Sequence, residues 1–214
     1  MAQGVSGDRY KEIDGQLFEI KRQLRQKSGY PFDLDALELA LQVIVEGRFD
    51  GNESVKASIL ELVGMVTIPA IGQFITKDHF VEDVTDTARV KISLLSHNFK
   101  SWFLDKTEAP AAEATLRYSK LVKSSTDGPI LAGLDSPETT LSHIFWLMEQ
   151  QKNGKKGVLL VNGYANVFYV RDVNGTLRAV DVRWLGGGWG VRADSFAGPR
   201  GWREGRQVFS RNSS

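Results

Sequence analysis

The chain has 214 residues, 42% of them hydrophobic and 25% charged, so it is long enough to bury a core in one large domain or two small ones. Its 27 lysines and arginines against 26 aspartates and glutamates give a net charge of +1, which excludes the overall basic excess of a dedicated nucleic-acid protein and a strongly acidic character. The absence of cysteine excludes disulfides and thiolate sites, and no apolar run approaches the roughly 20 residues that span a bilayer, so we expect a soluble cytoplasmic protein without a membrane segment.

The N-terminal part is predicted to form three short amphipathic helices. The first covers residues 8–27, the second begins after a cap at Asp33 or Asp35, and the third covers residues 53–63. We therefore expect residues 1–64 to form a helical bundle or lid and residues 65–214 to form an α+β domain. The apolar stripes of the three helices are Ile13, Leu17, Ile20 and Leu24, then Leu37, Leu41 and Ile44, then Val55, Ile59, Leu62 and Val63.

After Gly64 the pattern changes to short β-rich runs separated by polar turns. Residues 98–104 are predicted to form one or two helical turns, and residues 108–112, rich in alanine with a proline, an exposed loop or linker. The strands expected in this region are 68–75, 89–95 and 116–122.

Ser136-Pro137 places a capping hydroxyl before a proline at the first helical position, which predicts a helix from Ser136 to about Lys152. Its apolar residues recur at helical spacing and should face a sheet. They are Leu141, Ile144, Phe145 and Met148.

Two runs of strand-forming residues flank Asn174-Gly175, which predicts a β-hairpin. A two-residue turn, the register that we favour, pairs Val167 with Val182; a three-residue loop over residues 173–175, with Gly175 at a bulge, shifts the register by one. In the favoured register, one face of the hairpin is apolar and consists of Val167, Tyr169, Val180, Val182 and Trp184. The expected meander has strands at 157–161, 167–170, 177–184 and 189–196, with a short edge strand at 207–209.

The resulting fold class is α+β: N-terminal short helices followed by an antiparallel β-meander sheet packed on one or two helices.

The run from Gly157 to Asp172 (GVLLVNGYANVFYVRD) and the ending from Gln207 to Ser213 (QVFSRNS) resemble uncharacterised proteins of candidate-phyla (Patescibacteria-like) bacteria. The resemblance extends back through residues 78–80 and 98–100, and it covers much of the chain after about residue 70. It implies a bacterial origin and a recurrent module, and it brings no activity or functional residue with it.

The residues typical of catalysis are dispersed. The histidines His79, His97 and His143 lack the short spacing of a metal site, so we expect no metal and no cofactor. Residues 124–128 (SSTDG) fit neither a phosphate loop nor a nucleophile turn, and residues 186–190 (GGGWG) indicate a hairpin turn because a strand follows them. No catalytic residue is predicted.

Arginines and tryptophans concentrate in the C-terminal part, where no lysine occurs after Lys156. Arginine pairs with phosphate or carboxylate and stacks on aromatic rings, so one sheet face could hold an anionic ligand. The alternative is that arginine stems shield tryptophan rings within the molecule. The candidate ligand-binding residues are Arg183, Trp184, Trp189, Arg192 and Trp202.

These observations favour a non-enzymatic binding or protein-interaction module, with an unknown protein or an anionic polymer as the partner. One alternative is binding of nucleic acid or another anionic polymer through the C-terminal Arg/Trp face. Another is a hydrolase or transferase whose dispersed His/Asp/Ser site joins distant residues such as His79 and Asp127. The oligomeric state stays open.

Overall fold

The computed structural model describes residues 7–25, 37, 41, 59–196 and 201–212, and the chain divides into two compact units, Met1–Ser54 and Val55–Ser214. In the first unit, helix α1 (Gly7–Leu24) confirms the first predicted helix. The second predicted helix lies outside the described residues apart from two helical leucines, Leu37 and Leu41. In the described part of the chain no helix is long and apolar enough to cross a membrane.

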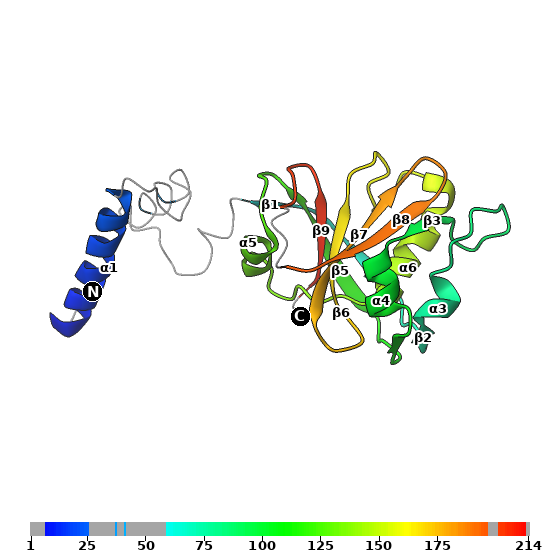
Figure 1. The fold of residues 1–214 in the computed structure, drawn as a ribbon, viewed down its shortest axis with the longest axis horizontal. Coiled ribbons are helices and arrows are strands. Elements are labelled where there is room, and N and C mark those ends of the chain that lie inside the picture. Colours follow the sequence, from blue (N-terminus) through cyan, green and yellow to red (C-terminus); the bar gives the residue numbers. More distant parts are fainter. Residues whose placement is uncertain (1–6, 26–36, 38–40, 42–58, 197–200, 213–214) are drawn as a thin grey trace. The chain divides into compact units, whose positions relative to one another are not determined.

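A seven-stranded sheet with the order β1-β5-β9-β6-β7-β8-β3 forms the centre of the second unit (Figure 1). Neighbouring strands run antiparallel except for the pairs β9–β6 and β8–β3, which run parallel. The α+β class is therefore confirmed, whereas a purely antiparallel meander is wrong. The strands are β1 (Leu60–Ile68), β3 (Ile92–Leu95), β5 (Ala114–Leu121), β6 (Asn166–Arg171), β7 (Leu177–Trp184), β8 (Trp189–Asp194) and β9 (Gln207–Arg211), and a second sheet pairs β2 (Phe74–Ile75) with β4 (Thr107–Glu108).

The helices of this unit are α3 (Thr76–His79), α4 (His97–Phe103), α5 (Asp127–Ala132) and α6 (Leu141–Gln150), followed by a 3₁₀ turn, η2 (Lys152–Gly154). The predicted helical turns at 98–104 are confirmed by α4. Helix α6 begins at Leu141 and not at Ser136, because Thr140 is its cap and accepts a hydrogen bond from the His143 N–H. Ser136 instead forms an isolated bridge with Arg211.

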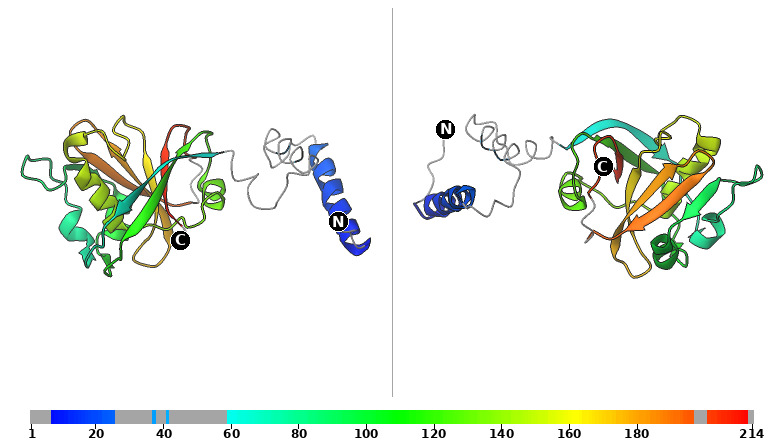
Figure 2. Two further views of the ribbon diagram at one scale, coloured as in Figure 1. Left: turned by 180° about the vertical axis from the view of Figure 1, so that it is seen from behind. Right: turned by 45° about the horizontal axis from the view of Figure 1, so that its top comes forward.

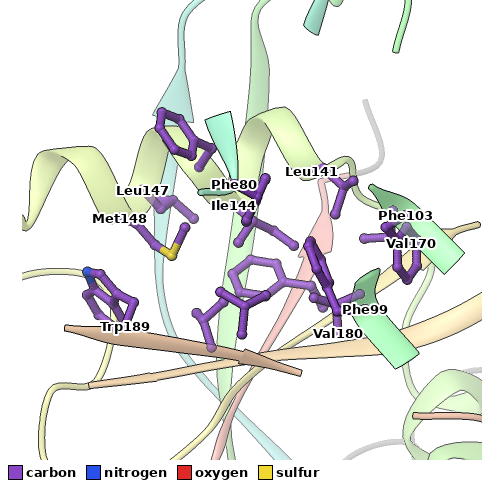
Figure 3. Packing of buried hydrophobic residues seen from close by; sticks show 14 of the residues in the cluster. Phe80, Phe99, Phe103, Leu141, Ile144, Leu147, Met148, Val170, Val180 and Trp189 are labelled. Carbon is purple, nitrogen blue, oxygen red and sulfur yellow. The ribbon is translucent and has the colours of Figure 1, made fainter. Parts of the chain in front are cut away.

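Side chains alternate along the strands, so the two faces of the sheet bury different cores. The first face carries the larger core, which α4 and α6 cover; Figure 3 shows side chains of α6, among them Ile144 and Met148, filling the space between helix and strands. The second face carries a smaller core that includes Tyr169 and Ile130 of α5. In the view from behind in Figure 2, α5 and α6 lie well apart with strands between them.

The β6–β7 hairpin has the three-residue register, so the favoured two-residue turn is wrong. Val167 pairs with Asp181 and Arg171 with Leu177. The Gly175 N–H donates to the Asp172 carbonyl, and Gly175 has φ +77°, as a glycine bulge after a turn requires. The shift by one residue separates the expected apolar face: Val167 and Tyr169 lie on the second face, whereas Val180, Val182 and Trp184 lie on the first.

Five further expectations need correction. Residues 68–75 do not form one strand, because β1 ends at Ile68 and β2 covers only Phe74–Ile75. Residues 60–63 belong to strand β1 and not to a third helix, and Leu62 and Val63 are exposed rather than inward. Glu108, expected in an exposed loop, is buried and lies in β4. Residues 157–161 form bends and not a strand. Strand β9 is not at an edge but between β5 and β6.

Candidate functional site

The tryptophans and the arginines predicted to bind a ligand lie in different places. Trp184 and Trp189 pack edge to face on the first face with their ring centroids 5.4 Å apart, and Trp189 is fully buried. Trp202 belongs to the core of the second face. Since residues of β7 and β8 alternate between faces, Arg183 and Arg192 lie on the second face, away from Trp184 and Trp189.

Arg183 and Arg192 are brought together by one buried carboxylate. Asp181 pairs directly with Arg192 on the neighbouring strand, and its Oδ1 accepts a hydrogen bond of 2.5 Å from the Nε of Arg183. Two more arginines, Arg203 and Arg206, come from the segment that precedes β9. Burial, and then the charges of Arg183 and Arg203, lower the pKa of Arg206. We call Arg183, Arg192, Arg203 and Arg206 the arginine cluster.

Two buried polar atoms here have no hydrogen-bond partner, the Oδ2 of Asp181 and the Nε of Arg206 in the arginine cluster. Burial raises the pKa of Asp181 despite its bond to Arg183. Burial is also the main cause of the lowered pKa of Arg206. The second carboxylate that acts electrostatically on Asp181 is Asp194. Asp181 interacts electrostatically with Arg183, Arg192 and Arg206, so guanidinium groups outnumber the carboxylates Asp181 and Asp194 here.

Two exposed aromatic residues, one on the second face and one near Arg206, were missed by sequence reasoning. Phe196 is 38% exposed and packs edge to face on Tyr169 of the second face, with a centroid distance of 5.7 Å. Tyr164 is 50% exposed and lies close enough to Arg206 to interact with it electrostatically. The turn residues directly before Tyr164, Asn162-Gly163, were the one sequence signal that its ring lies at a surface.

Asp127 is engaged in holding the second face together. It is buried, and its Oδ1 accepts hydrogen bonds from the Tyr169 hydroxyl at 2.9 Å and from the Trp202 indole N–H at 2.7 Å. His79 stacks on Phe74 of the first-face core, with a centroid distance of 4.2 Å. The two residues of the dispersed catalytic site therefore lie on opposite faces of the sheet.

A cavity of about 460 Å³ beside the start of α6 gathers a histidine, a carboxylate and a hydroxyl. His143 is 2% exposed, and burial lowers its pKa to about 4. However, the Glu108 carboxylate accepts from the backbone N–H groups of Leu141 and Ser142, the Thr140 hydroxyl bonds to that of Ser142, and the Nδ1 of His143 has no partner. The pairing of base and nucleophile that catalysis needs is not formed.

Within the residues that the structure describes, no three histidines or acidic residues gather into a potential metal site. The arginine cluster therefore remains the strongest candidate site, since it combines concentrated charge with unpartnered buried atoms. Comparisons with protein-family models, with curated proteins and with solved structures find no match for this chain.

Proposed function

We propose that the chain is a non-enzymatic binding module for an anionic polymer, which it contacts through the arginine cluster. The observation that carries the proposal is the gathering of Arg183, Arg192 and Arg206 around one buried carboxylate, with Arg203 near Arg206, while the Nε of Arg206 has no hydrogen-bond partner. Guanidinium groups hold phosphate, sulfate and carboxylate through paired hydrogen bonds, and an excess of them in a partly desolvated place attracts such anions.

The exposure of the arginine side chains fits an open surface along which a polymer lies better than it fits a closed pocket. Arg192 and Arg203 are exposed, whereas Arg183 and Arg206 are partly buried. The charges come from β7, from β8 and from the segment before β9, so they extend across several elements of the second face. A chain of repeated anionic groups can satisfy charges distributed in this way better than a single small ion can.

The alternative role, shielding of tryptophan rings by arginine stems, fits another arginine. The guanidinium carbon of Arg178 lies 4.2 Å from the centroid of the Trp102 ring, which is a cation–π contact within the molecule. Arg183 and Arg192 cannot shield Trp184 and Trp189 because the sheet lies between them. The shielding interpretation therefore leaves the arginine cluster without a role.

The test is a fluorescence titration of labelled polyphosphate and labelled single-stranded DNA over about 50 to 200 mM salt. Changing both Arg192 and Arg203 to glutamine should weaken binding of both ligands and flatten the dependence of affinity on salt. For the single strand, the slope of log affinity against log salt should flatten by about 1.4 if each arginine neutralises one phosphate. These side chains are exposed, so the variant should keep its fold.

The matched control is Arg89→Gln, because Arg89 is an exposed arginine that pairs with Glu149 and lies over the Phe145 ring of the first-face core. This variant should bind like the wild type. The proposal would be refuted if the wild type bound neither ligand at the lowest salt, or if the control variant lost as much affinity as the double variant.

A further inference from the structure

Tyr164 presents an aromatic ring next to the arginine cluster in a fixed position. Its ring packs over Gly205, where a Cβ atom would come within 2.8 Å of the ring. Gly205 also has φ +85°, a backbone conformation that other residues rarely adopt. The backbone N–H of Tyr164 donates to the Asn162 side chain at 3.1 Å, which fixes the turn before it. Half of the tyrosine nevertheless stays exposed.

The ring borders a cavity of about 610 Å³, a volume in the range of small-ligand sites. The walls of this cavity combine apolar groups, carboxamides and charges of both signs. Such a lining suits a flat heterocycle, whose faces are apolar and whose edge carries hydrogen-bonding groups. Besides Tyr164 and Gly205, the cavity is lined by Val63, Lys120, Leu160, Asn162, Glu204 and Gln207.

Arg206 connects the arginine cluster to the cavity, since it stands in sequence between two residues that line the cavity. Gly205 and Gln207, the neighbours of Arg206 in sequence, both line the cavity, and Tyr164 lies close enough to Arg206 to interact with it electrostatically. A ligand that places a ring against Tyr164 and an anionic group near Arg206 would engage both. A nucleotide unit carries these two groups a short covalent distance apart.

We infer that the anionic polymer is a single-stranded nucleic acid, with one base stacked on Tyr164 at the mouth of this cavity and the adjoining phosphates on the arginine cluster. The inference rests on the proposed function and narrows its ligand. Stacking on an exposed aromatic ring beside a positive surface is how proteins hold unpaired strands. A duplex keeps its base faces inside the helix, and sulfated or acidic polymers have no base to stack.

The experiment compares an oligothymidylate of about 10 nucleotides, within the usual site size of such surfaces, with polyphosphate of matched charge. Tyr164→Ala should weaken binding of the oligonucleotide by about 5- to 150-fold, the range of one lost base stack, and leave polyphosphate binding unchanged. Tyr164→Trp, which keeps a stacking ring, should restore binding of the oligonucleotide. The double change of Arg192 and Arg203 to glutamine should weaken binding of both ligands.

Phe18→Ala is the matched control, since Phe18 is an exposed aromatic of α1 in the other unit. Circular dichroism of each variant checks that it is folded. Equal weakening of both ligands by Tyr164→Ala, or no effect on the oligonucleotide, would overturn the inference while the proposed function stands. Binding of neither ligand by the wild type would overturn the proposed function as well.

Discussion

At the scale of single residues, Asp127 and His143 are both buried polar groups, but they affect stability in different ways. The Asp127 carboxylate accepts from both Tyr169 and Trp202 and so ties α5, β6 and the segment before β9 into the second face. The Nδ1 of His143 has no partner, so its ring is kept neutral by burial. One group stabilises the fold through its hydrogen bonds, and the other makes stability depend on pH.

Replacing Asp127 with alanine should lower the free energy of unfolding by about 2–4 kcal/mol, because two buried donors lose their acceptor. Tyr169→Phe, which removes one donor and leaves the Trp202 bond intact, should cost only about 1 kcal/mol. Urea denaturation of the three proteins measures both changes. A cost for Asp127→Ala no larger than that of Tyr169→Phe would show that the carboxylate does not link the two rings.

Stability should fall as pH falls from 6.5 toward 4 because of His143. The pKa of this group is 6.5 when unfolded and about 4 when folded, so the unfolded chain binds the extra proton over this window. His143 therefore contributes about 3 kcal/mol to the pH dependence of the free energy of unfolding, a stabilisation that is fully present above pH 6.5 and lost by about pH 4. Urea denaturation across this window should show a flatter pH profile for His143→Gln, whereas the exposed His97→Gln control should keep the wild-type profile.

At the scale of elements, the length of the β6–β7 loop, three residues rather than two, decided which side chains share a face of the sheet. The β6–β7 loop holds Val173, Asn174 and Gly175, and the Asp172 carboxylate accepts from the N–H groups of Asn174 in the loop and of Thr176 directly after it. Asp172 also pairs with Arg178 at 2.9 Å. These contacts favour the three-residue register, which places Asp181 on the second face.

Gly175→Val should therefore lower the free energy of unfolding by about 1–3 kcal/mol, because a β-branched residue is strained at φ +77°. Gly72→Val is the control, since Gly72 lacks a positive φ and open space surrounds the added Cβ. Thermal or urea midpoints report the difference. Equal midpoints for Gly175→Val and the wild type would show that the loop accommodates another conformation.

At the scale of the whole molecule, the last strand completes the sheet from within. Strand β9 joins β5 on one side and β6 on the other, so the sheet is continuous only when the C-terminus is in place. Val208 and Phe209 bury their side chains on opposite faces and thereby belong to both cores. An edge strand, as the sequence predicted, would contribute to one neighbour only.

Ending the chain after Arg206 should prevent cooperative folding, because both neighbours of β9 lose their hydrogen-bond partners and both cores lose a side chain. Ending it after Asn212 should leave the thermal midpoint unchanged, since β9 ends at Arg211. Calorimetry and circular dichroism distinguish the two outcomes. A cooperative transition in the shorter chain would place β9 outside the folding unit.

Local patterns in the sequence correctly determined α1, α4, β5, the buried stripe of α6 and the turn between β7 and β8. Each depends on side-chain spacing or turn residues within a few positions, so the signal lies inside the segment itself. The sequence also singled out Arg183 and Arg192 by composition. It missed Tyr164 and placed the tryptophans beside the arginines.

Only the tertiary structure decided the hairpin register, the central place of β9 and the approach of Arg206 to Asp181 and Arg183. These features depend on pairing between segments far apart in sequence. A shift of one residue exchanges the two faces of a strand without changing its local pattern. The arginines and tryptophans alternate along β7 and β8, so their separation onto opposite faces follows from the sheet that those strands join.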